Sequence, residues 1–252
     1  AATPIIADTV TMERELTRVE AVGTARARAS ALIYPESGGE VVKVHFTAGD
    51  FVEQGDVLLE LESRQETLDV RLARVQVQDA EQLLARYRRI EDTGAVSDSQ
   101  IDEAQTALDA ARIALEQAEV ALSNRTVIAP FPGYLGLSDV DPGARITAST
   151  TIAPLDDRRV LFVDFATPEQ IFGRIQPGDV VDVMPFSRDG ESLQARIAGV
   201  DSRIDPTRRT FTVRAAIDND TDDLRPGMSF RVTFSVPGDP YPVVPEAAIV
   251  WG

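Results

Sequence analysis

The sequence predicts an elongated, multidomain α+β protein in which a helical hairpin interrupts a small β domain and an antiparallel β-barrel follows. Three observations lead to this fold class. The middle of the chain carries a seven-residue apolar repeat, the segments on either side of it resemble each other, and the last third alternates short apolar runs with turn residues. The first observation predicts the helices, the second the divided β domain and the third the barrel.

Composition limits the kinds of function. The chain of 252 residues has a formal net charge of −16, which argues against a nucleic-acid partner because phosphate contacts need clustered Lys and Arg. It contains no cysteine and a single histidine, His45, so disulfides, thiol chemistry and structural zinc sites are not expected, and we expect no cofactor. No segment approaches the roughly 20 apolar residues of a membrane-spanning helix.

The seven-residue repeat predicts a long helix that packs against a close neighbour. Large apolar residues recur at one core position and alanines recur three residues later, and no Gly or Pro occurs between Val96 and Ser123. The repeat consists of Ile101, Leu108, Leu115 and Leu122, and of Ala104, Ala111 and Ala118. Alanine at the second position lets the neighbouring helix approach closely.

A second helix is expected just before it, over residues 64–90. Its apolar residues keep mainly three- and four-residue spacing; they are Leu68, Leu72, Val75, Ala80, Leu83, Leu84, Tyr87 and Ile90. Gly94 suits a helix C-terminus, and Ser97 or Asp98 suits the next N-cap. Residues 64–124 therefore predict two antiparallel helices, each on the order of 40 Å long. The alternative, ordinary bundle core, needs a third or fourth helix, and the sequence offers none.

The flanks of this hairpin form an internal duplication. Residues 32–41 and 127–136 each contain an apolar pair, a proline, a glycine and a short strand pattern, and residues 48–52 and 141–146 each add a glycine turn and a second strand. Each half is too small to bury a core alone. We therefore expect the two halves to pack together into one β domain, with the hairpin inserted between them.

The remaining strand patterns predict a small antiparallel barrel. Candidate strands at 161–165, 180–183, 195–200, 210–217 and 229–236 are separated by turn residues such as Pro226-Gly227. The stretch 15–28 is also expected to be extended and to supply a strand to the same barrel.

The duplicated halves resemble those of a biotinyl-lipoyl carrier domain. Carriers hold their cofactor on a Lys at the turn between the halves, where this chain has the hairpin; Lys43 lies in a strand pattern instead, so lipoyl or biotin carriage is rejected. A split lipoyl domain with an inserted hairpin resembles the membrane fusion protein (HlyD/AcrA-type) family of periplasmic adaptors. Three later stretches are also similar to this family: Asp205 to Arg214, Asn219 with Leu224 to Met228, and Val244 to Ile249.

The resemblance implies a set of domain boundaries. They are 1–12 for a partial membrane-proximal β segment, 13–28 with 155–236 for the barrel, 29–62 with 125–154 for the lipoyl-like domain, 63–124 for the hairpin and 237–252 for the start of a truncated membrane-proximal domain. The segment that targets or anchors the protein is expected outside these 252 residues.

The resemblance also implies site residues at the hairpin tip. Adaptors of resistance-nodulation-division (RND) pumps carry a pattern Arg-x3-Leu-x6-Ser that contacts a TolC-type outer-membrane channel. Arg86, Ile90 and Ser97 take these positions here, with Ile in place of Leu, and Gly94 lies in the same turn. The purely structural alternative makes Ile90 the last core residue, Ser97 an N-cap and Arg86 a solvated charge.

The function implied is that of a scaffold. The family joins an inner-membrane RND transporter to an outer-membrane channel in a tripartite drug or toxic-compound efflux pump, with six copies in RND assemblies, in the periplasm and attached to the inner membrane. The alternative is the same architecture serving an ABC, major-facilitator or type I secretion transporter. An enzyme is not expected, because a Ser-His or Cys-His device could use only His45, which lies in a strand pattern.

Overall fold

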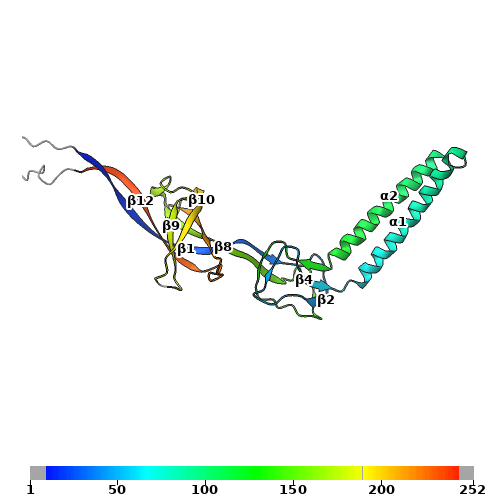
Figure 1. Cartoon of the computed structure of the whole chain (residues 1–252), viewed down its shortest axis with the longest axis horizontal. Coiled ribbons are helices and arrows are strands. Elements are labelled where there is room, and N and C mark those ends of the chain that lie inside the picture. Colours follow the sequence, from blue (N-terminus) through cyan, green and yellow to red (C-terminus); the bar gives the residue numbers. More distant parts are fainter. Residues whose placement is uncertain (1–9, 189, 244–252) are drawn as a thin grey trace, which may run out of the picture. The chain divides into compact units, whose positions relative to one another are not determined.

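The computed structural model describes residues 10–188 and 190–243, and the chain divides into two units. One unit consists of residues 1–29 and 158–252, and the other of residues 30–157 (Figure 1). Strands β1 (Thr11–Ile33) and β8 (Ala153–Pro168) contribute residues to both. Much of the expected membrane-proximal sequence, including Val244 to Ile249, lies outside the described residues. None of the described helices is long and apolar enough to cross a membrane.

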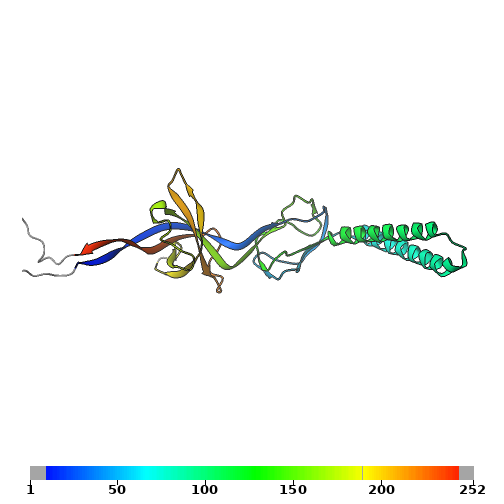
Figure 2. The ribbon, with the colours of Figure 1, turned by 90° about the horizontal axis from the view of Figure 1, so that it is seen from above.

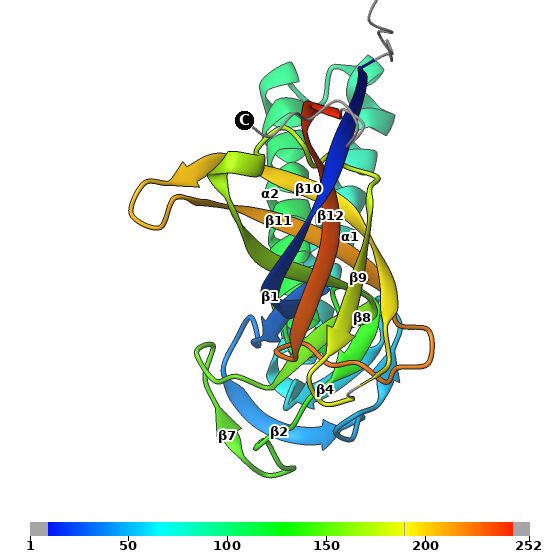
Figure 3. The same cartoon turned by 90° about the vertical axis from the view of Figure 1, so that its left-hand side faces the viewer.

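The first unit is a closed antiparallel barrel (Figure 3). Within the described residues its remaining strands are β9 (Val180–Pro185), β10 (Leu193–Asp205), β11 (Thr210–Asp218) and β12 (Ser229–Val243). The order β1-β12-β9-β10-β11-β8 is closed by a pairing of β1 with β8. The strands run longer than their apolar runs predicted. The added end of β10 is exposed, whereas β8 is lengthened at its start by residues that include the buried Ala153 and Leu155. A short 3-10 turn, η2 (Glu169–Ile171), follows β8.

Alternating side chains fill the barrel. Val163, Val183, Val213 and Phe230 are fully buried, each in a strand whose neighbouring residues point outward. Gly23 of β1 faces the same interior, and a Cβ built there would lie 2.5 Å from Val163 Cγ1. The absence of a side chain at this position is therefore what lets β1 pack closely against β8.

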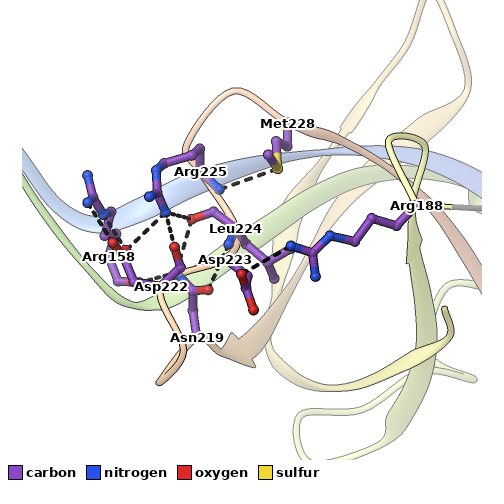
Figure 4. A network of polar contacts seen from close by, with 8 residues as sticks. All are labelled: Arg158, Arg188, Asn219, Asp222, Asp223, Leu224, Arg225 and Met228. Atoms are coloured by element: carbon purple, nitrogen blue, oxygen red, sulfur yellow. Dashed lines mark hydrogen bonds and ion pairs between the residues drawn. The ribbon is translucent and has the colours of Figure 1, made fainter.

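The loop before β12 is anchored by side chains rather than by regular structure (Figure 4). The buried Asn219 accepts a hydrogen bond from Leu224 N at 2.9 Å and donates to the carbonyl oxygens of Leu224 and Arg158 at 3.1 and 2.9 Å. Arg158 donates to both carboxylate oxygens of Asp222, at 2.5 and 2.7 Å. The similarity of this stretch to the family thus corresponds to a loop that is fixed onto β8.

The second unit combines a strand-rich domain with the hairpin. Its short strands are β2 (Gly39–Val44), β3 (Phe51–Val52), β4 (Val57–Leu61), β5 (Thr126–Ile128), β6 (Gly133–Leu135) and β7 (Arg145–Ile146). They pair as β5-β4-β2-β7 and as β3-β6-β8. Every pairing among β2 to β7 except β2 with β4 joins a strand before the hairpin to one after it, so the two halves share one core.

The duplication seen in the sequence reappears as matching pairs. Val52 of the first half lies opposite Gly133 of the second, and Ile146 of the second half lies opposite Gly39 of the first. In the first pair the first half supplies the valine and the second half the glycine. In the second pair the second half supplies the apolar residue and the first half the glycine, as expected for a repeat related by a pseudo-twofold axis.

The backbone bonds beside these strands repeat in the same way. Gly49 N donates to Leu135 O at 2.7 Å, and Gly143 N donates to Val41 O at the same distance. Both glycines have positive φ, +93° and +87°, which suits a residue without a Cβ at a tight turn. At each of the repeated glycine turns, one half thus forms a backbone hydrogen bond with the other half.

The hairpin connects β4 to β5 and has its own small core (Figure 2). It consists of α1 (Arg64–Ile90), the 3-10 turn η1 (Glu91–Thr93) and α2 (Asp98–Ser123). The buried seam contains Val70, Ala73, Leu84, Ala104 and Leu108. On α2 these are repeat positions predicted from the sequence. On α1, however, Leu68, Leu72 and Val75 are exposed rather than buried, because the seam uses the other apolar face of that helix.

Candidate functional site at the hairpin tip

The tip is a tight turn that has a glycine where the first helix ends and a serine where the second begins. Helix α1 runs into η1, and Gly94 ends it with φ +71° while its N–H donates to Glu91 O at 3.1 Å. A left-handed conformation of this kind is ordinary for glycine at a helix C-terminus. No atom lies within 4 Å of the position of an added Cβ at Gly94, so this residue sets the turn and leaves its surface open.

Ser97 begins α2 through a reciprocal capping box. Gln100 N donates to Ser97 Oγ at 3.3 Å, and Ser97 N donates to Gln100 Oε1 at 3.0 Å. Each side chain thus satisfies a backbone N–H that the helix leaves without a partner. Ser97 is therefore the N-cap, and it remains exposed. The sequence prediction gave an N-cap without its partner Gln100, although the Ser-x-x-Gln spacing is the signature of a capping box.

The arginines near the end of α1 differ in what they contact. Arg88 donates to Gln105 Oε1 across the hairpin at 3.0 Å, and Arg89 donates to Ala85 O at 3.3 Å. Arg86 is exposed and forms no hydrogen bond or ion pair with another described residue. Ile90, one turn later, is 36% exposed and is not part of the buried seam. Arg86 thus offers a free guanidinium beside an exposed apolar side chain.

The four residues proposed from the sequence therefore lie within the last turn of α1 and the connection to α2. Arg86 and Ile90 are available for contact, whereas Gly94 and Ser97 also shape the turn. Among the described residues no group of three or more His, Cys, Asp or Glu side chains could hold a metal ion. The chemistry available at this tip is recognition of another surface by charge and apolar contact.

A polar clamp fixes the base of the hairpin. Arg125, which follows α2, donates from Nη1 to Gly38 O at 2.6 Å and from Nη2 to Glu66 Oε1 at 2.5 Å. Ser37 Oγ donates to Asn124 O at 3.1 Å beside it. These bonds tie the end of α2 to the first turn of α1 and to the strand-rich domain. Arg125 and Glu66 lie 59 positions apart, and no local sequence pattern points to either of them.

Comparison with known proteins agrees with this architecture. Residues 29–155 match the family described as RND MFP, barrel-sandwich hybrid domain, and residues 161–238 match the family described as CusB-like, beta-barrel domain. The two matched ranges correspond to the strand-rich unit with its hairpin and to most of the barrel.

Individual relatives cover almost the whole chain. An uncharacterized protein of Haemophilus influenzae is 28% identical over 92% of the chain and 61% of its own length. The multidrug resistance protein MdtA of Yersinia pseudotuberculosis is 27% identical over 99% of the chain and 62% of its own length. The chain thus spans about three fifths of the length of these curated relatives.

A solved structure shares the fold. The crystal structure of a MacA-MexA chimeric protein, which contains the Pseudomonas aeruginosa MexA α-hairpin domain, has a TM-score of 0.81 at 20% identity and covers 94% of this chain and 87% of the chimera. The α+β fold class expected from the sequence, with its hairpin, lipoyl-like domain and barrel, is confirmed. The chain belongs to the RND membrane fusion protein (MFP) family of periplasmic adaptors, which are scaffolds and not enzymes.

Proposed function

We propose that the protein is the periplasmic adaptor of a tripartite efflux pump, linking an inner-membrane RND transporter to a TolC-type outer-membrane channel. The observation that carries this proposal is a helical hairpin that has its own core and is inserted in a split lipoyl-like domain. Near its tip lies Arg86, which is exposed and forms no hydrogen bond or ion pair with another described residue. The name of its relative MdtA, a multidrug resistance protein, supports a role in drug or toxic-compound efflux.

The proposed division of labour follows the expected domains. Residues 63–124 reach the channel, with Arg86, Ile90, Gly94 and Ser97 at the contact. Residues 13–28, 155–236 and the membrane-proximal segments meet the transporter. Several copies, six in the RND assemblies of this family, surround the path of the transported compound. The protein resides in the periplasm and is held at the inner membrane through sequence outside these 252 residues.

Site-directed cross-linking tests the channel contact directly. The chain lacks cysteine, so a single cysteine at Arg86 or Ile90 gives one defined attachment point. We expect both to cross-link to the channel in intact cells, and Arg112→Cys, in the middle of α2, to give no such product. Cross-links from Arg112→Cys alone would contradict the tip assignment.

A matched pair of arginine variants separates contact from helix stability. Arg86→Ala removes a free guanidinium, whereas Arg88→Ala removes one that bonds to Gln105 within the hairpin. We expect Arg86→Ala to lower efflux-dependent resistance several-fold and Arg88→Ala to change it little.

Co-purification with an RND transporter, rather than with an ABC or major-facilitator transporter, identifies the inner-membrane partner.

A further inference from the structure

An apolar groove lies in the strand-rich domain, where the end of β1 and the residues after it run near β5. Its volume is about 460 Å³. Ile33 and Val127 line it and belong to the domain core, whereas Leu32 and Ile128, which also line it, are 55% and 52% exposed. Grooves that hold a small organic molecule have volumes of roughly 300–1,000 Å³. This groove is therefore large enough for such a molecule.

Hydrogen bonds hold the two segments that form the groove. Ser37 Oγ donates to Asn124 O at 3.1 Å, and Arg125 Nη1 donates to Gly38 O at 2.6 Å, so the chain after β1 meets the chain before β5. Among the described strands β5 pairs only with β4, which leaves its other edge without a strand. The groove is thus already formed in the single chain, and a ligand has little of the chain to order.

Side chains that point away from the domain core give the groove apolar walls. Leu32 and Tyr34 flank the buried Ile33, so both lie on the outer face, and Tyr34 is 45% exposed. Val57 lies opposite Ile128 in the pairing of β4 with β5 and is 40% exposed, which extends the apolar surface beside the groove. An apolar ligand in the groove would remove part of this surface from water.

One carboxylate sets the charge of the groove. Of the described residues that line it only Glu36 is charged, and Glu36 forms no hydrogen bond or ion pair with another described residue. Arg125 does not neutralise it, because its guanidinium is largely buried and already bonded to Glu66 and to Gly38 O. A carboxylate and the face of an aromatic ring both attract a cation, so Glu36 and Tyr34 together favour a positively charged ligand.

A second copy of this chain suits the groove less well than a small molecule does. If the groove of one copy met the groove of another, two Glu36 carboxylates would approach each other, and each chain has a formal net charge of −16. Nine described residues line the groove, whereas a stable protein interface takes about 20–30 residues from each partner.

We infer that the groove binds an amphipathic organic cation, with its apolar body against Leu32, Tyr34 and Ile128 and its charged group at Glu36. Burial of apolar surface supplies the binding free energy, and Glu36 with Tyr34 supplies the preference for a cation over an anion of similar shape. This site goes beyond the proposed function and does not depend on it, because all the groups that form it belong to one chain.

Fluorescence anisotropy with the purified chain measures this binding directly. The probe is rhodamine 6G, a cation with a planar apolar body, and fluorescein, an anion with a similar ring system, is its control. We expect saturable binding of rhodamine 6G and at least about fivefold weaker binding of fluorescein. No saturable binding of rhodamine 6G, or equal affinity for the two dyes, would overturn the inference.

Variants of the two polar groups locate the bound cation. Glu36→Gln and Tyr34→Ala should each weaken rhodamine 6G binding about two- to fivefold, whereas Tyr34→Phe keeps the ring and should bind like the parent protein. Glu53→Gln is the matched control, since Glu53 is exposed and its carboxylate has no bonding partner among the described residues, but it does not line the groove. Equal affinity in Glu36→Gln and in the parent would place the dye elsewhere and overturn the inference.

A variant of the apolar wall separates a small ligand from a second copy of the chain. Leu32→Ala should weaken rhodamine 6G binding several-fold, and Val42→Ala, which changes a side chain 54% exposed outside the groove, should not. Circular dichroism checks that both variants are folded. In sedimentation velocity the parent and Leu32→Ala should behave alike; a dimer of the parent that Leu32→Ala dissociates would assign the groove to a second copy and overturn the inference.

Discussion

Arg125, two residues after the end of α2, donates a 2.5 Å hydrogen bond to Glu66 in the first turn of α1. Both side chains are largely buried, and Arg125 also holds the carbonyl oxygen of Gly38. Charged groups in such a position are costly to leave without a partner. The pair therefore fixes where the hairpin leaves the strand-rich domain.

Arg125→Ala should destabilise the protein by about 2–4 kcal/mol, because it leaves a largely buried carboxylate and a carbonyl oxygen without their donor. Arg74→Ala is the matched control, since Arg74 pairs with Glu119 at 2.9 Å but both side chains are exposed; we expect it to cost at most about 1 kcal/mol. Urea unfolding monitored by circular dichroism measures both. Equal losses of stability in the two variants would show that the Arg125–Glu66 pair contributes no more than an ordinary surface ion pair.

This clamp also shows why parts of the site could not be predicted from the sequence. Arg125 bonds to residues 59 and 87 positions away, and no local pattern links such distant positions. Local signals served better: the seven-residue repeat predicted the burial of Ala104 and Leu108, and Gly94 and Ser97 were correctly placed at helix ends.

Helix α1 illustrates the opposite limit. It has apolar residues on two faces, and spacing alone predicts a helix without telling which face meets α2. The seam uses Val70, Ala73 and Leu84, whereas Leu68, Leu72 and Val75 remain exposed. The missing information is the position of the partner helix, which only the folded chain supplies.

Ser97 separates a capping role from a contact role. Ser97→Thr keeps the hydroxyl that accepts from Gln100 N, whereas Ser97→Ala removes it and should cost about 1 kcal/mol. If Ser97 serves only as a cap, efflux-dependent resistance should follow stability, and the threonine variant should behave like the parent protein. We expect the threonine variant to be as stable as the parent yet to lose channel cross-linking from Ile90→Cys, because its added methyl group lies at the proposed contact.

Gly23 is expected to be needed for closing the barrel. A Cβ at this position would lie 2.5 Å from Val163 Cγ1 and 3.3 Å from Asp164 O, and Val163 is fully buried with a stiff, branched side chain. Gly23→Ala should therefore destabilise the protein by about 1–3 kcal/mol. Thermal unfolding measures the change.

Gly199→Ala provides the control for Gly23→Ala. Gly199 lies in β10 of the same barrel, has no positive φ, and no atom lies within 4 Å of its added Cβ. Its substitution should be neutral or stabilising by up to about 1 kcal/mol, because it restricts only the unfolded chain. If both variants lost a similar amount of stability, the close packing of β1 on β8 would not be the reason why Gly23→Ala is destabilising.

Asp222 should make the stability of the protein depend on acid pH. Hydrogen bonds from Arg158 hold the pKa of Asp222 below its usual value, with burial opposing them more weakly. A carboxyl whose pKa is lower in the folded than in the unfolded state stabilises the fold fully above its unfolded pKa, about 3.9 for Asp, and this contribution disappears as the pH falls through the folded value. Asp222→Asn should therefore be less stable than the parent at pH 7, by about 1–2 kcal/mol, and the difference should shrink below about pH 4.

Urea unfolding of parent and variant at pH 7 and pH 3 measures this dependence on Asp222. The substitution does not strain the backbone, because Asp222 has φ +53° and asparagine accepts this conformation readily. Asp223→Asn is the control: its carboxylate is half exposed and pairs with Arg188 at 3.1 Å, so we expect a smaller change at pH 7. A difference between parent and Asp222→Asn that is the same at both pH values would show that lost geometry, and not the charge of Asp222, destabilises the loop before β12.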